Sequence, residues 1–176
     1  MHKKQRGSFN KKYLIFSIIG VIIFAVLLSF FTLKPTNKPI SQPKTTNSTP
    51  TISKYTTIKK NLDQRFNQNG KVVTIKQENN INDSTSKQPH SVIVVKLIDK
   101  QTQKYLKASY EAVQNNQASD DQKNYVHSIQ KIISDQAKKL NNNYDVIQFV
   151  YQDGKKFIPV ASSQKTRDII KVVKTK

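Results

Sequence analysis

Residues 144–161 read YDVIQFVYQDGKKFIPVA, and this stretch contains the clearest fold signal in the chain. Two runs rich in β-branched and aromatic residues flank Asp153 and Gly154, a dipeptide that tolerates the positive φ angles of a tight turn. The stretch therefore predicts a β-hairpin.

Apolar side chains alternate onto both faces of the first strand of this hairpin. Such a sheet is either covered by helices or contributes a face to an interface with a partner. The aromatic residues of the hairpin and the lysines at its tip are therefore the candidate interaction surface: Tyr144, Phe149, Tyr151, Lys155, Lys156 and Phe157.

Two helices are predicted ahead of the hairpin. Leu106, Tyr110 and Val113 recur at helical spacing and mark the buried face of the first. Residues 119–122, SDDQ, form a capping box at the start of the second, whose apolar stripe continues to Leu140.

A helix and two strands are predicted at the start of this region. Apolar residues three or four positions apart from Tyr55 to Phe66 mark the helix, and residues 71–77 and 91–98 are β-branched runs. A last element at 169–173, IIKVV, is either a strand or a short helix. The order indicates an α+β domain over residues 55–176, with helices packed on a mostly antiparallel sheet.

A membrane anchor is predicted at residues 13–33, which contain no charged residue. A helix of this length spans about 30 Å, the thickness of the hydrocarbon core. Residues 1–12 contain basic residues and no acid, so they form a cytoplasmic tail and the domain lies outside. The alternative is a cleaved secretory signal, which is typically shorter and ends in a small-x-small site that is missing here.

A short tether is predicted between anchor and domain. Residues 34–54 are rich in Pro, Thr and Lys and contain too few apolar residues to fold. Fully extended, they reach at most about 65 Å.

Composition excludes several kinds of site. The four glycines lie too far apart for a phosphate-binding loop, and the lack of cysteine excludes thiol chemistry and zinc–thiolate sites. His90 and His127 are interpreted as partly exposed residues without a catalytic role. The sequence thus predicts no metal, no cofactor and no catalytic residue.

The chain is strongly basic, with 30 Lys plus Arg against 11 acids and a formal net charge of +19. Because nearly all the basic residues are Lys, which lacks the planar fork of Arg, we expect no specific nucleic-acid recognition. Two explanations remain open: AT-rich coding bias, or attraction to anionic lipid headgroups or the anionic polymers of a Gram-positive envelope.

These features predict a single-pass membrane protein of a bacterial cell envelope, whose extracytoplasmic domain is a binding or accessory module without evident catalysis. Its partners are the lipid bilayer, through residues 13–33, and an envelope protein or anionic polymer. Two alternatives remain: a subunit of a secretion or DNA-transfer complex, and an envelope hydrolase that uses a carboxylate pair such as Asp99 and Asp145.

Overall fold

Three helices and a four-stranded sheet make up residues 55–175, the part of the chain that the computed structural model describes. They form a small α+β domain, as predicted. The elements follow one another as α2 (Thr56–Phe66), β1 (Val73–Ile81), β2 (His90–Leu97), α3 (Lys100–Gln114), α4 (Asp120–Ala137), β3 (Val146–Asp153) and β4 (Lys156–Ser163).

The predicted anchor at 13–33 and tether at 34–54 lie outside the described residues. Within residues 55–175, no helix has both the length and the apolar character that crossing a membrane requires.

The sheet is mixed, with strand order β1-β2-β3-β4. The outer pairs β1/β2 and β3/β4 are antiparallel, while β2 and β3 at the centre are parallel, with Val92 opposite Val146 and Lys96 opposite Val150. Two of the three pairings are antiparallel, as predicted for a mostly antiparallel sheet, but the parallel pairing at the centre was not predicted.

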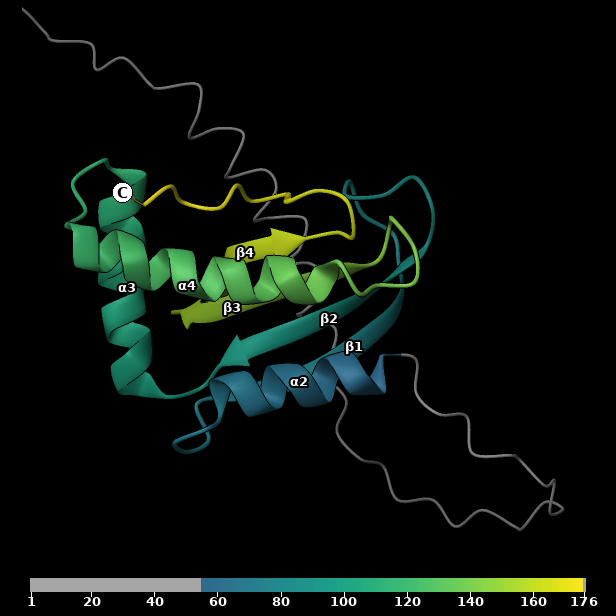
Figure 1. The fold of residues 1–176 in the computed structure, drawn as a ribbon, viewed down its shortest axis with the longest axis horizontal. Helices are drawn as coiled ribbons and strands as arrows, with labels where there is room; N and C mark the ends of the chain where they lie inside the picture. Colours follow the sequence, from purple (N-terminus) through teal and green to yellow (C-terminus); the bar gives the residue numbers. More distant parts are fainter. Residues whose placement is uncertain (1–54, 176) are drawn as a thin grey trace, which may run out of the picture.

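Helix α4 explains why the central strands are parallel. Its 18 residues extend about 27 Å, which matches the length of an eight-residue strand. Figure 1 shows α3 crossing the end of the sheet where β2 and β3 finish, and α4 running back along the sheet, so β3 starts beside the start of β2.

The main core lies between the sheet and helices α2 and α4, which cover the same face (Figure 1). Leu62, Leu106 and Ile133 from the helices are fully buried against Ile93 and Ile147 of the central strands. On the other face, Val92, Val94, Val146 and Val150 form a smaller buried cluster that includes no residue of the three described helices.

Two local signals in the sequence are confirmed. The hydroxyl of Ser119 accepts from the backbone of Gln122, whose side chain accepts in return from the Ser119 backbone, so α4 begins with the predicted capping box. In the hairpin, Asp153 pairs with Lys156, and Gly154 takes a φ of 59°, a conformation that glycine adopts without steric cost.

Residues 169–173 form neither of the predicted elements, because no strand or helix lies there. After a single bridge between Ser163 and Asp168, the chain passes alongside α4 instead. Gln130 and His127 of α4 bond the backbone N–H and C=O of Val173, which replaces the pairing that a strand would have provided.

Candidate functional site

A cleft opens at the end of the sheet where β2 and β3 finish and α3 begins. Its volume is about 550 Å³. We call it the lysine cleft, and the residues that line it are Lys96, Ile98, Lys100, Gln103, Lys104, Lys107, Gln152, Asp153 and Gly154.

Three of the four lysines come from one side of α3. Lys100, Lys104 and Lys107 are spaced by four and three residues, which places them on the same face of a helix. At 1.5 Å per residue, they extend over about 10 Å along the helix axis. The fourth, Lys96, comes from the end of β2, so basic groups line the cleft from two elements.

The charges at one end of the cleft are balanced locally. Lys107 Nζ lies 2.8 Å from Asp153 Oδ1 and 3.9 Å from Glu111 Oε1. The hydrogen bond to Asp153 raises the pKa of Lys107, so this lysine is positively charged at neutral pH. The pair also connects α3 to the tip of the hairpin.

The remaining lysines give the cleft its excess positive charge. Among residues 55–175, no ion pair is found for Lys100 or Lys104, and both side chains are exposed. Lys96 lies with its Nζ 4.5 Å from the ring centre of Phe157, and partial burial, followed by the charge of Lys76, lowers its pKa. The cleft therefore combines four lysines with a single acid, Asp153.

The N-terminus of α3 is capped by the side chain of the residue that precedes the helix. Asp99 is the N-cap, and its carboxylate accepts from the backbone N–H of Thr102 at 2.7 Å. Hydrogen bonds from Thr102 lower the pKa of Asp99, so the carboxylate stays charged. An anion in the cleft would therefore be bound by lysine side chains rather than by the free backbone amides of the helix.

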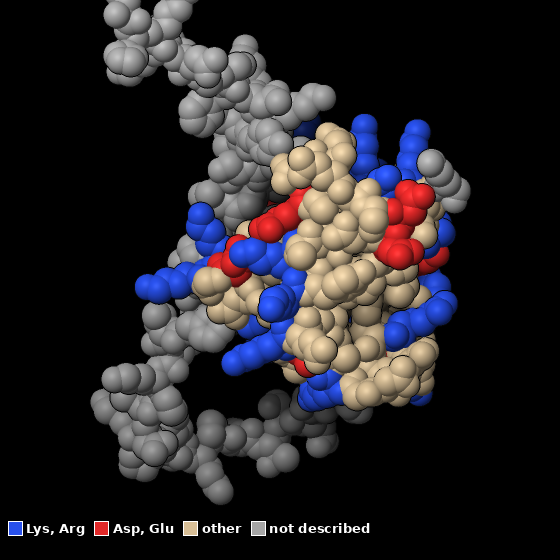
Figure 2. Space-filling view, turned by 90° about the vertical axis from the view of Figure 1, so that its left-hand side faces the viewer, with Lys and Arg blue, Asp and Glu red and all other residues tan. Residues whose placement is uncertain are grey.

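Figure 2 looks onto this end of the molecule. Lysine and arginine side chains project on both sides of a neutral central strip, interspersed with acidic side chains. The positive charge is thus concentrated in separate groups rather than spread over one continuous basic face.

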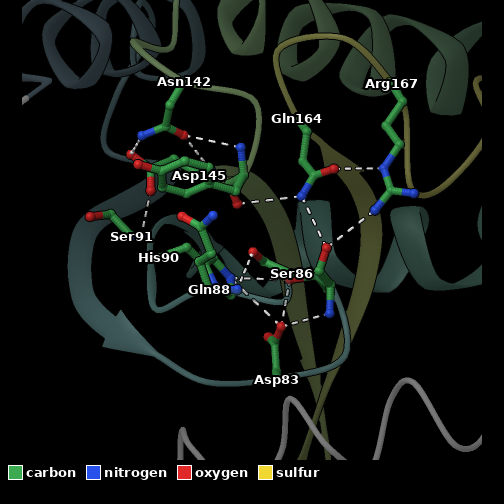
Figure 3. Close-up of polar contacts among 11 residues, drawn as sticks. Asp83, Ser86, Gln88, His90, Ser91, Asn142, Asp145, Gln164 and Arg167 are labelled. Carbon is green, nitrogen blue, oxygen red and sulfur yellow. Dashed lines mark hydrogen bonds and ion pairs between the residues drawn. The ribbon is translucent and has the colours of Figure 1, made fainter.

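The opposite end of the sheet, where β2 and β3 begin, contains a hydrogen-bonded network (Figure 3). Nε2 of the buried His90 lies 3.1 Å from the hydroxyl of Thr85 and 3.6 Å from Asp83, and Thr85 donates to Asp83 at 2.5 Å. Among the described residues, Nδ1 of His90 has no hydrogen-bond partner. His90 therefore lacks the carboxylate on Nδ1 that orients a catalytic histidine.

The same network attaches the segment after β4 to the loop at 82–89. Gln164 donates to the carbonyl oxygens of Thr85 and Tyr144, and Arg167 donates to Thr85 and to the side-chain oxygen of Gln164. Figure 3 shows these side chains pointing toward one another. Because these groups bind each other, the network stabilises this end of the domain.

Asp145 lies at the centre of a second group of contacts at this end. Its carboxylate accepts from the Tyr55 hydroxyl at 2.5 Å, from the Ser91 backbone N–H at 2.7 Å and from the Asn142 side chain at 2.9 Å. Donors of this kind satisfy a buried carboxylate, so Asp145 has a structural role.

The carboxylate pair considered for a hydrolase is not brought together. Asp145 precedes β3, beside the start of β2, whereas Asp99 follows the end of β2. Ser91, which bonds Asp145, and Asp99 are eight residue steps apart along an extended strand, a separation of about 26 Å. Because β2 and β3 are parallel, the start of one cannot meet the end of the other.

Only some of the residues predicted to form an interaction surface are exposed. Phe149 and Tyr151 are each 2% exposed and belong to the main core, because their side chains point toward the helices. Phe157 is half-buried on the opposite face, whereas the exposed residues are Tyr144, Lys155 and Lys156. Tyr144 precedes β3 and the two lysines lie at the hairpin tip, so these three residues are at opposite ends of the hairpin.

The two histidines differ from each other. His127 is half-buried on α4, with Nδ1 2.6 Å from the carbonyl oxygen of Val173, as expected for a residue at the edge of a helix. His90 is 3% exposed, so the expectation of partial exposure was wrong. Its neighbours Asp83 and Thr85 come from the preceding loop, whose return over the strand was not visible in the sequence.

Within residues 55–175, no group of three or more His, Cys, Asp or Glu side chains could hold a metal ion.

The lysine cleft was not predicted from the sequence. One signal for it was present, the spacing of Lys100, Lys104 and Lys107 along a predicted helix. The contribution of Lys96 and Asp153 depends on the parallel pairing of β2 and β3, which was not predicted.

Comparison with protein-family models, with curated proteins and with solved structures finds no match to the chain.

Proposed function

We propose that the chain is a membrane-anchored, extracytoplasmic binding protein of a bacterial cell envelope, and that the lysine cleft is its binding site for an anionic partner. The observation that supports this most directly is the composition of the cleft, in which four lysines face one aspartate. Residues 13–33, with no charged residue, support the anchor.

Lysine suits a partner that carries charge without a fixed planar geometry. Its ammonium group is a hydrated point charge, so attraction to a polyanion does not require a single bound orientation. The exposed side chains of Lys100 and Lys104 are available for such contacts, and Lys107 and Asp153 fix the shape of one end of the cleft.

The binding site is tested with full-length protein in detergent and inorganic polyphosphate as the probe. The variant Lys100→Gln/Lys104→Gln removes two charges and keeps good helix formers. At about 1 kcal/mol for each lysine near an anionic surface, affinity should fall by about 30-fold. The affinity of the unchanged protein should fall steeply as salt is raised.

The matched control is Lys139→Gln/Lys165→Gln, which removes the same charge from exposed positions at the other end of the domain. It should change the affinity by less than about twofold, since charges beyond a Debye length of about 8 Å are screened. Equal losses in the two variants would mean that net charge rather than the cleft causes binding, and the proposal would be wrong.

The anchor is tested separately by adding protease to intact cells. We expect the domain to be cleaved from outside while residues 1–12 stay protected, and the protein to remain in the membrane fraction after a high-salt wash. Release by salt would contradict an apolar anchor.

A further inference from the structure

If residues 13–33 are in a membrane, the tether attaches the Tyr55 end of the domain to that membrane, and the other end of the domain has no such attachment. The tether leads into Tyr55, whose hydroxyl bonds Asp145 at the start of β3. Asp153, at the end of the same strand, lines the lysine cleft. The strand between them spans about 26 Å, so Tyr55, the residue that follows the tether, and the cleft are at opposite ends of the domain.

We infer that the lysine cleft, at the end of the domain opposite Tyr55, binds a linear polymer of phosphodiester-linked polyols or sugars. The inference rests on the proposed function, and it names the partner's chemistry. A lipid headgroup would offer the same phosphodiester, but the domain would have to turn over on its tether to bring the cleft to the membrane.

The lining of the cleft fits a partner that alternates charge with neutral polar groups. The amides of Gln103 and Gln152 stand among the lysines, and Gln103 donates to the backbone carbonyl of Gln152. Ile98, which is 38% exposed, adds an aliphatic surface. Hydroxyl groups and short carbon segments between phosphates would contact these residues, whereas a compact inorganic anion would use only the lysines.

The spacing of the lysines along α3 favours a chain over a single group. Lys100 and Lys104 are separated by about 6 Å along the helix axis, which suits successive charges on one polymer. When one phosphate is bound, the next is held at a high effective concentration, so a polymer gains affinity that its monomer lacks.

Duplex DNA is a different partner with the same charge. The four basic residues of the cleft are all lysine, and its lining residues include no arginine, whose planar fork reads base edges in the major groove. The cleft therefore lacks the features that usually accompany nucleic-acid binding, and DNA is used as a competitor in the test.

The test uses full-length protein in phosphatidylcholine nanodiscs. The probes are a defined poly(glycerol phosphate), the single diester glycerophosphoglycerol, and duplex DNA of the same total charge as the polymer. We expect the polymer to bind at least about tenfold more tightly than the single diester. DNA should bind at least about tenfold more weakly than the polymer, because its deoxyribose–phosphate backbone offers no free hydroxyl groups to Gln103 and Gln152.

Nanodiscs that contain phosphatidylglycerol test the direction of the cleft, because this lipid has the same headgroup chemistry. Their effect on polymer affinity should be less than about twofold, since with the Tyr55 end toward the membrane the length of β3 keeps the cleft beyond the screening length of about 8 Å. Loss of about tenfold or more would show that the cleft contacts its own membrane, and would overturn the inference.

The two variants separate this inference from the proposed function. Lys100→Gln/Lys104→Gln should weaken polymer binding at least about tenfold, and Lys139→Gln/Lys165→Gln less than about twofold. If DNA or the single diester binds as tightly as the polymer and the first variant still abolishes that binding, the cleft is an anion site and only the polymer class is wrong. If the first variant changes no binding, the proposed function fails as well.

Discussion

The hydroxyl of Tyr55 donates a hydrogen bond of 2.5 Å to Oδ2 of Asp145, 90 residues further along the chain. The same hydroxyl accepts from the backbone N–H of Asn141 at 3.3 Å. Tyr55 is 8% exposed and has a φ of 71°, a conformation that is uncommon for a tyrosine. Tyr55 is therefore fixed to the start of a central strand.

Replacing Tyr55 with Phe should destabilise the domain. The substitution keeps the ring in the core but removes one donor from a buried carboxylate, which costs about 1–3 kcal/mol. Urea denaturation of the two proteins, followed by circular dichroism, measures this difference in the free energy of unfolding.

The control is Tyr105→Phe, because Tyr105 is 49% exposed on α3. Its effect should stay within about 0.5 kcal/mol. Equal stabilities of the Tyr55 variant and the unchanged protein would show that the hydrogen bond to Asp145 contributes nothing to folding.

Two buried glutamines on α4 should respond oppositely to the same substitution. Gln130 donates to the carbonyl oxygen of Val160 and accepts from the backbone N–H of Val173. In Gln130→Leu both backbone groups lose their partner, so we expect a loss of about 1–3 kcal/mol and faster hydrogen exchange at Val173.

Gln136 is also buried, at 8% exposed against 2% for Gln130, but among the described residues its Oε1 has no hydrogen-bond partner. Gln136→Leu removes a buried, unsatisfied oxygen and should be neutral or stabilising. Thermal unfolding of the two variants side by side is the measurement. A larger loss in the Gln136 variant than in the Gln130 variant would contradict this account.

The capping box of α4 should be measurable through Ser119. Ser119→Ala removes the oxygen that accepts from the Gln122 backbone and should cost about 1 kcal/mol. Ser119→Asp supplies another good N-cap acceptor and should retain most of the stability. Chemical denaturation of the three proteins tests the order, and an unstable Asp variant would show that the hydroxyl has a further role.

Glu78 should make stability depend on pH in an unusual direction. Burial raises the pKa of this half-buried carboxyl above 4.5, and the charge of Lys76 opposes part of the increase. Because the folded state binds this proton more tightly than the unfolded state does, its contribution is present below pH 4.5 and is lost as pH rises through the folded pKa. Glu78→Gln should therefore be more stable than the unchanged protein at pH 7 and similar to it at low pH.

Asp135 provides the opposite case. Hydrogen bonds from Lys131 and Lys138 lower its pKa below 3.8, so its contribution is present above that value and is lost as pH falls through the folded pKa. Asp135→Asn should be less stable than the unchanged protein at pH 7. Urea denaturation across this pH range measures the stability of both variants. If both change the stability at pH 7 in the same direction, at least one of the two pKa directions is wrong.

Local signals in the sequence predicted most elements correctly. The capping box at Ser119 and the turn at Gly154 depend on neighbouring residues, so a short stretch of sequence determines them. The strand pairing depends on how far α4 carries the chain back, which is a property of packing. For that reason the parallel contact between Val92 and Val146 could not be predicted from either strand alone.

The candidate site also combines features that the local sequence determines with features that depend on packing. The lysine spacing on α3 can be read directly from the sequence, because it needs only helical periodicity. The approach of Lys107 to Asp153, 46 residues away, requires the end of β2 to lie beside the end of β3. Burial of Phe149 and Tyr151 likewise depends on which face of the strand the helices cover, and alternation alone leaves that choice open.

The parallel pairing at the centre of the sheet also sets the order of events during synthesis. For a domain outside the membrane, as proposed, β1 and β2 emerge on the outer side first, and β2 then has one antiparallel neighbour and one edge that must wait for β3. Residues 98–145 separate the two strands, so at 5–20 residues per second the wait lasts about 2–10 s. During that time the unpaired edge of β2 (His90–Leu97) is a template for wrong pairing with another chain, so misassembly at this edge would limit how much protein reaches the native fold.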